Sequence, residues 1–337
     1  MLNHISLLES SHFPVMLDEV IKVCAPFNGG IFLDCTFGGG GYSKKILTFP
    51  KTKVVALDRD KFVLNTAKEL EKKYPNRFSF YQKKFSEVNT VVNDQKVDGI
   101  IFDLGLSSIQ LNNLKRGFSF KSKESLDMSM GLTSLSAEKV LNESSEQKLR
   151  LIIKILGEEK EANRIVKNII KSRSINKITK VNQLVGIIEK SKKKNYANKT
   201  NPSTKTFQAL RIFVNKEITE LILGITNATK ILKPGGKILI VSFHSIEDKV
   251  VKYFFSNFSS SRSKPSRYFP DIQNVNTSLF EKYKNKIFKP SLKEINQNPP
   301  SRSAKFRYAI RSKNKFIFPE DLQIKFKKYL DLEDYIA

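Results

Sequence analysis

The chain is poor in the residues that cross-link extracellular proteins or bind structural metals. Its 337 residues include two cysteines, Cys24 and Cys35, and three histidines. Two cysteines without a repeated spacing exclude a disulfide framework, and we interpret them as buried thiols of a protein from a reducing compartment. Cysteine and histidine residues at zinc-site spacing are absent, so we predict no metal site. A serine nucleophile motif and internal repeats are absent as well.

Long apolar runs are also missing. No stretch approaches the ~20 apolar residues of a membrane-spanning helix, so no membrane partner is predicted. The N-terminus, Met1 to His4, lacks a basic region followed by an apolar stretch, and we therefore expect no secretory signal. Hydrophobic residues make up 40% of the chain, which is enough to build a packed core.

Acidic residues are scarce relative to basic ones. The chain has 59 Lys and Arg against 33 Asp and Glu, a net charge of +26. A cationic surface of this size favours a polyanion, and nucleic acid is the first candidate partner. The alternative is compositional drift, because lysine heavily outnumbers arginine and Asn and Ile are frequent, as in proteins from AT-rich genomes.

The most informative stretch is residues 30–43. A short apolar run, 31–33, ends in Asp34, four glycines follow at Gly38 to Gly41, and a helix-like segment starts at Ser43. Strand, glycine turn and helix in this order are typical of the opening unit of a nucleotide-binding α/β sheet. Glycine is required where the backbone turns at positive φ and approaches a ligand closely. The alternative is a glycine-rich surface loop.

A second apolar strand, residues 53–58, ends in Asp58. This acid lies 17 residues after Gly41, close to the roughly 20 expected for a carboxylate that binds ribose hydroxyls. The glycines do not follow the G-x-G-x-x-G spacing of a dinucleotide site. In addition, Asp34 would repel a pyrophosphate and attract the ammonium of a methionine moiety. The pattern therefore favours S-adenosylmethionine over NAD, and an NAD-dependent oxidoreductase is the alternative.

Two further strands supply candidate site residues. Residues 78–85 alternate and end in Phe85, which either borders an adenine ring or belongs to the core. Residues 97–103 end in Asp103, whose carboxylate could accept a hydrogen bond from an amine that is being methylated. Ligands of open parallel sheets bind beyond the carboxyl ends of the strands, so we expect Asp34, Asp58, Phe85 and Asp103 to face one crevice.

The middle of the chain predicts an inserted helical domain. Residues 136–194 have helical periodicity and show no strand. We predict a discontinuous α/β core over 1–112 and 202–337, with an all-helical insert over 113–201.

The remaining elements complete the α/β core. We expect a long helix over 201–232, a fifth strand over 237–244, and two last strands over 287–295 and 304–311, the second antiparallel. A tail helix is expected within 316–337. His244, at the end of the fifth strand, could act on a proton or have a structural role.

Ordered motifs run through nearly the whole chain, in residues 15–19, 34–43, 56–60, 102–110, 116–120, 126–128, 206–215, 241–248 and 302–307. In these motifs the chain resembles the ribosomal RNA small subunit methyltransferase H family, also called MraW. The resemblance implies a Rossmann-like, S-adenosylmethionine-dependent methyltransferase of the bacterial cytoplasm. It implies methyl transfer to the exocyclic N4 of one cytidine in the decoding region of 16S rRNA, and an inserted domain that helps hold the RNA.

The resemblance also assigns site residues. The family's cofactor contacts correspond to Gly40, Gly41, Tyr42, Asp58, Phe85, Asp103 and Gln110. Our own reasoning adds Asp34 to this set and gives Asp103 the catalytic role, because its carboxylate could accept a hydrogen bond from the amine. Tyr42 replaces the usual histidine, so a contact through backbone survives and one through imidazole does not. Ile109 replaces a usual proline, and Ser129 and Gly131 replace a usual Arg and Asp.

A third interpretation is a non-catalytic RNA-binding protein of ribosome assembly with a degenerate cofactor site. Tyr42 is the feature that favours it, whereas intact Asp34, Asp58 and Asp103 argue against it. In an active enzyme the target base would have to leave its stack, and Phe118 or Phe120 could then stack on it.

Overall fold

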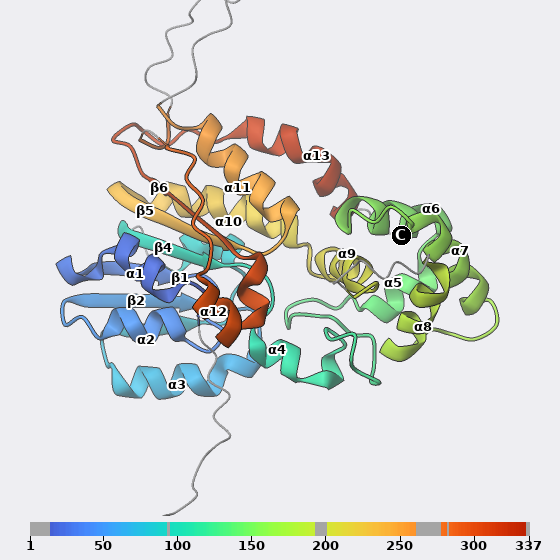
Figure 1. Ribbon diagram of the computed structural model, residues 1–337. Coiled ribbons are helices and arrows are strands. Elements are labelled where there is room, and N and C mark those ends of the chain that lie inside the picture. Colours follow the sequence, from blue (N-terminus) through green and yellow to red (C-terminus); the bar gives the residue numbers. More distant parts are fainter. Residues whose placement is uncertain (1–13, 93–94, 193–200, 261–277, 282, 335–337) are drawn as a thin grey trace, which may run out of the picture.

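Six strands form one sheet at the centre of the computed structural model, which describes residues 14–92, 95–192, 201–260, 278–281 and 283–334 (Figure 1). The spatial order is β3-β2-β1-β4-β5-β6. Neighbouring strands are parallel except for the β5–β6 pair, which is antiparallel. The bounds are β1 Gly30–Asp34, β2 Thr52–Leu57, β3 Phe78–Tyr81, β4 Val97–Asp103, β5 Leu232–Ser242 and β6 Lys305–Ile310. The architecture confirms the predicted Rossmann-like α/β class.

Helices cover both faces of the sheet, which explains why the central strands are apolar almost throughout. On one face a core forms between the sheet and α1 Leu17–Cys24, α2 Gly41–Leu47 and α3 Leu64–Lys73. On the other face lie α10 Glu217–Ile231, α11 Ser245–Asn257 and the tail helix α13 Glu320–Asp334. The tail helix was predicted from the sequence. Cys24 and Cys35 are both free and buried, as interpreted above.

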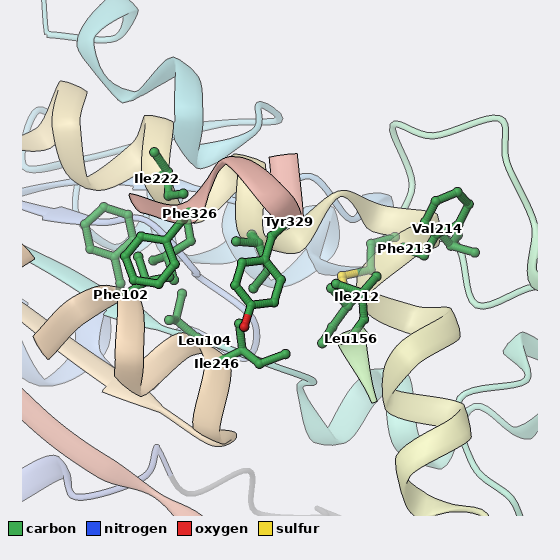
Figure 2. Close-up of a cluster of buried hydrophobic side chains, with 14 of the residues drawn as sticks. Phe102, Leu104, Leu156, Ile212, Phe213, Val214, Ile222, Ile246, Phe326 and Tyr329 are labelled. Carbon is green, nitrogen blue, oxygen red and sulfur yellow. The ribbon is translucent and has the colours of Figure 1, made fainter. Parts of the chain in front are cut away.

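The segment between β4 and α10 is helical. It contains α4 Ser108–Asn112, α5 Ala137–Glu143, α6 Glu146–Leu151, a π-helical turn Ile152–Leu156, α7 Ala162–Arg173, α8 Val181–Ser191 and α9 Thr204–Asn215. Its apolar core is continuous with one face of the sheet. Figure 2 shows Phe102 of β4, Ile222 of α10 and Tyr329 of α13 in one cluster with Leu156 and Phe213 of the helical segment.

The long helix expected over 201–232 is wrong in one respect, because two helices replace it. α9 ends at Asn215, Lys216 takes a left-handed conformation with φ 50°, and α10 begins at Glu217. α9 packs against the π-helical turn and α5, whereas α10 packs against the sheet. The break depends on tertiary contacts: the Asn215 side chain donates to Met128 O at 2.8 Å and accepts from Met130 N at 2.8 Å.

The strand expected over 287–295 is also wrong. Phe288 makes an isolated bridge to Phe306, and α12 Leu292–Gln297 follows. Ser291 begins this helix because its side chain accepts from Glu294 N at 3.1 Å, the usual start of a helix. The antiparallel strand expected over 304–311 is confirmed as β6. Among the described residues, none of the helices combines the length and apolar character needed to span a bilayer.

Candidate active site

A cavity of about 1320 Å³, part of it open to solvent, lies beyond the carboxyl ends of the parallel strands. Four predicted site residues, Asp58, Phe85, Asp103 and Gln110, line it together. The structure therefore brings together side chains that are up to 52 residues apart in the sequence. The other four, Asp34, Gly40, Gly41 and Tyr42, are not among the lining residues.

The glycine turn forms one wall of the cavity through Gly38, whose N–H donates to Asp58 Oδ2 at 2.8 Å. Gly40 precedes α2 at φ 75°, and a Cβ there would lie 2.8 Å from the Phe37 ring. A Cβ at Gly41 would lie 2.6 Å from the Pro14 ring. The turn therefore requires glycine at positions 40 and 41 because a side chain there would collide with neighbouring rings. Neither Gly40 nor Gly41 lines the cavity.

Asp34 is not among the residues that line the cavity, unlike the three side chains with which it was expected to share one crevice. Its carboxylate is fully buried and accepts from Ser43 Oγ at 2.6 Å and from Thr36 N at 3.4 Å. Burial raises the pKa of Asp34 to about 6, although both hydrogen bonds lower it. Because Ser43 belongs to α2, the carboxylate ties the helix to the end of β1 behind the glycine turn.

Asp58 follows β2 and is held by two backbone donors. Its Oδ1 accepts from Asp60 N at 2.9 Å and its Oδ2 accepts from Gly38 N. Burial raises the pKa of Asp58 to about 6, because the two hydrogen bonds only partly offset desolvation. A carboxylate fixed at this position can also accept from a ribose hydroxyl.

Asp103 ends β4, and its backbone N–H donates to Thr36 Oγ1 at 2.7 Å. Within the described part of the chain its buried Oδ1 has no hydrogen-bond partner. Burial, and then the negative charges of Asp34 and Glu247, raise the pKa of this carboxyl well above its usual value. An unsatisfied acceptor beside a cavity is suited to a ligand that brings a donor or a positive charge.

Phe85 and Gln110 complete the predicted set. The Phe85 ring lines the cavity and stands edge-on to Phe102, with centroids 5.5 Å apart. Gln110 Nε2 donates to Asp60 Oδ2 at 2.8 Å, and its Oε1 accepts from Ser107 N at 3.0 Å. Both polar groups of Gln110 therefore already hold the start of α4 against the loop after β2.

Tyr42 keeps its hydroxyl away from the cavity. The side chain is buried, and its hydroxyl donates to the carbonyl of Val15. The tyrosine therefore fixes the segment before α1 without obstructing the cavity. Phe118 packs under the Arg116 guanidinium and Phe120 stands against Phe207, and neither ring lines the cavity.

Several lining residues were not predicted from the sequence. Arg59 Nε donates to Met130 O at 3.1 Å, and its Nη1 donates to Asn215 O at 3.1 Å. These bonds close one side of the cavity with the loop around Met130. Arg59 directly follows the predicted Asp58, but its contacts depend on how the helical segment folds back. The acids Glu217, Glu220 and Glu247 and the amide of Asn298 were also missed.

The cavity is acidic although the chain carries a charge of +26. Among the described residues, five carboxylates line it, Asp58, Asp103, Glu217, Glu220 and Glu247, against two basic side chains, Arg59 and Lys83. One further cation offsets this excess, because Arg211 binds both carboxylate oxygens of Glu217 at 2.8 Å. Such a cavity attracts a cationic ligand and repels a pyrophosphate.

His244 has a structural position. It caps α11, with Nδ1 accepting from Glu247 N at 3.4 Å and Nε2 lying 3.1 Å from Glu247 Oε1. Glu217, His244 and Glu247 bring one ligand atom each within 4.8 Å of one another, but Arg211 already occupies the Glu217 carboxylate.

A parallel sheet with a glycine turn, a held acid after its second strand and an acidic cavity defines the class of Rossmann-like methyltransferases. The chain belongs to the MraW methylase family, whose sequence model matches residues 9–312. S-adenosylmethionine is the cofactor, which removes the NAD-dependent alternative. The resemblance inferred from the motifs is thereby confirmed.

Curated relatives are similar over most of their length. The chain is 39% identical to ribosomal RNA small subunit methyltransferase H of Ehrlichia ruminantium (strain Welgevonden), covering 89% of this chain and 99% of the relative. It is 41% identical to the protein of the same name from Rickettsia canadensis, covering 90% and 98%. Among solved structures, an rRNA methylase from Streptococcus thermophilus aligns with a TM-score of 0.39 and 10% identity, covering 87% of this chain and 96% of that one.

Proposed function

We propose that this methyltransferase transfers the methyl group of S-adenosylmethionine to the exocyclic N4 of a cytidine in the decoding region of 16S rRNA, in the bacterial cytoplasm. Relatives that are about 40% identical carry the name of a small-subunit rRNA methyltransferase. The observation that carries the proposal is the unpartnered, buried Oδ1 of Asp103 beside an acidic cavity.

The residues present fit the cofactor. Asp58 would accept from the ribose hydroxyls, Gly38 leaves room for the close approach of a ligand, and Phe85 would border the adenine. The excess of carboxylates favours a ligand that carries a sulfonium and an ammonium. When bound, S-adenosylmethionine supplies an electrophilic methyl group. Direct contacts through Asp34, Gly40, Gly41 and Tyr42 have less support, because these residues stand outside the lining.

The chemical demand on the protein is orientation of the amine. The N4 of cytosine is a poor nucleophile because its lone pair is conjugated with the ring. If Asp103 Oδ1 accepts one N4 hydrogen, the lone pair can turn toward the methyl group at roughly 3 Å, and alignment then lowers the barrier. After transfer the aminium loses its proton readily, so no strong base is required, and His244 has no proton-transfer step in this scheme.

The RNA would be held by charge and shape. A net charge of +26 favours binding to the phosphate backbone, and the target cytidine would be flipped out of its stack into the cavity. The insert, with the proposed bounds 113–201, contributes Met130 to the cavity lining, so RNA held by the insert could reach the site.

The second candidate function is a non-catalytic RNA-binding assembly factor. The feature in its favour is Tyr42, which replaces the usual histidine. The Tyr42 hydroxyl is bonded to Val15 and leaves the cavity unobstructed. That observation removes the main reason for a degenerate site.

Mass spectrometry of ribosomal RNA tests the proposal. Cells that lack the gene should lose N4-methylation of one cytidine in 16S rRNA, and the wild-type gene should restore it while Asp103→Ala should not. Binding of S-adenosylhomocysteine to the folded variant separates loss of catalysis from loss of cofactor. An unchanged methylation map in the deletion strain, or normal methylation with Asp103→Ala, would contradict the assignment.

A further inference from the structure

Glu220 is a cavity residue for which the mechanism above has no use. It lies in the first turns of α10, lines the cavity and is 6% exposed. Its Oε1 lies 3.4 Å from Lys84 Nζ, whereas its buried Oε2 has no hydrogen-bond partner among the described residues. A buried acceptor without a donor is costly, and such groups are rare unless a ligand completes them.

The surroundings of Glu220 indicate which part of the cofactor it meets. Lys84 directly precedes Phe85, the ring expected beside the adenine. One turn after Glu220, Gly224 lies so close to the Phe85 ring that a Cβ there would approach it to 2.6 Å. Glu220 and Phe85 therefore belong to the same part of the cavity wall.

The other acids that line the cavity either have carboxylate oxygens already bonded to protein groups or lie where a different part of the cofactor is expected. Both oxygens of Glu217 are bonded to Arg211. Glu247 Oε2 accepts from Phe243 N at 2.8 Å, and its Oε1 faces His244. Asp58 is held by the glycine turn at the ribose position, and Asp103 ends β4 where the methyl group would lie. Among the acids that the structure describes in the cavity lining, Glu220 is the one that keeps an unbonded acceptor on the Phe85 side.

We propose that Glu220 accepts the hydrogen bond of the adenine 6-amino group and so selects adenosine over inosine cofactors. The adenine edge carries an N–H donor at this position, which matches a carboxylate oxygen that only accepts. A 6-oxo base would present a second acceptor to the same oxygen and be rejected. The inference rests on S-adenosylmethionine as the cofactor, but not on the identity of the methylated nucleotide.

Calorimetric binding of two ligands to the full chain tests this role. The probes are S-adenosylhomocysteine and its 6-oxo counterpart, S-inosylhomocysteine. The wild type should prefer the adenosyl ligand by about ten- to a hundredfold, the usual range for a hydrogen bond to a charged group. Glu220→Gln should narrow that preference by about tenfold, because a carboxamide can donate to the 6-oxo group as well as accept.

Lys84→Met is the matched control, since it removes the ion-pair partner of Glu220 and keeps the acceptor. It should leave the ligand preference unchanged, and thermal unfolding of each variant reports on folding. Equal ligand preference in the wild type and Glu220→Gln, with normal S-adenosylhomocysteine affinity, would overturn the role of Glu220 alone. Failure of the wild type to bind S-adenosylhomocysteine would overturn both the cofactor assignment and the role of Glu220.

Discussion

Glu333, in the last turn of α13, caps the start of α10 at Thr219. Its Oε2 accepts from Thr219 N at 2.8 Å and from Thr219 Oγ1 at 2.6 Å, and its Oε1 accepts from Ile218 N at 3.1 Å. These are orphan donors of a helix N-terminus, which favours a negative charge. The tail helix lies beyond residue 312, where the family match ends. It therefore supports, from outside that region, the turns that present Glu217 and Glu220 to the cavity.

Removing this cap should weaken both the fold and the site. We expect Glu333→Ala to lower the free energy of unfolding by about 1–3 kcal/mol, because it leaves buried donors unsatisfied. Cofactor affinity should fall as well, since the first turns of α10 would fray. Asp334→Asn is the matched control, because the Asp334–Lys216 pair is largely exposed and contributes little. Denaturant titrations and S-adenosylhomocysteine binding measure the two effects, and equal stability of both variants would refute the capping role.

The same carboxyl makes stability depend on pH. Burial raises the pKa of Glu333 to about 7, although its hydrogen bonds to Thr219 and Ile218 lower it. A raised pKa means that the folded state binds the proton more tightly than the unfolded state. This contribution to stability is present below about pH 4.5 and is lost as the pH rises to 7.

Urea titrations between pH 4.5 and 8 can isolate that contribution by comparing the wild type with Glu333→Gln. The difference in unfolding free energy between the two proteins should drift by about 3 kcal/mol at most across this window and level off above pH 7. Parallel pH profiles of the two proteins would show that Glu333 titrates normally in the folded state.

The cofactor should bind with release of a proton. The pKa of Asp103 is raised, mainly by burial, so its carboxyl holds a proton more readily in the free protein than an ordinary aspartate does. A sulfonium nearby favours the ionised form, so the proton leaves on binding. Calorimetry near pH 7 in buffers of different ionisation enthalpy measures the protons released on binding. More protons should be released when S-adenosylmethionine binds than when S-adenosylhomocysteine binds, because the sulfur of S-adenosylhomocysteine is uncharged. Asp103→Asn should remove this excess and lower turnover by about 10²–10³-fold, and identical proton release in both proteins would count against Asp103 as the responsible group.

The glycine turn offers a test of backbone shape. Gly40 and Gly235 both have φ between 75° and 79°, but a Cβ meets the Phe37 ring at Gly40 and open space at Gly235. Gly235→Ala should cost about 1–2 kcal/mol of stability for the left-handed backbone alone. Gly40→Ala should cost about 1–3 kcal/mol more from overpacking and should weaken cofactor binding. Thermal unfolding and ligand titration of the two variants would settle the difference, and equal losses would mean that Phe37 moves aside without cost.

Local patterns predicted the strands and the acids that end them, because short apolar runs and their boundaries are encoded by neighbouring residues. Asp58 and Asp103 reached one cavity for that reason. The strand expected over 78–85 ends at Tyr81, and Phe85 reaches the same cavity from the start of a 3₁₀ helix, residues 85–90. Asp34 did not reach it, because the direction of a strand's last side chain depends on which partner it meets, here Ser43 of α2. Glu217 and Glu220 were not predicted as cavity residues because their position depends on the helix break at Lys216. Contacts such as Glu333–Thr219 join residues 114 apart and leave no local pattern.

Asn215 joins α9 to the loop at Met130, which borders the cavity. It is 1% exposed, donates to Met128 O, accepts from Met130 N, and its carbonyl accepts from Arg59 Nη1. Asn215→Ala would take the side-chain partner away from Met128 O and Met130 N, while the backbone bond to Arg59 would remain, so we expect a loss of about 2–4 kcal/mol of stability. Because the loop at Met130 borders the cavity, S-adenosylhomocysteine should also dissociate faster.

Asn168→Ala, on α7, removes a side-chain hydrogen bond to Ser191 without touching the cavity and serves as the control. Stopped-flow release measures the effect, and an unchanged dissociation rate in a destabilised Asn215→Ala protein would show that the loop closes the cavity without this side chain.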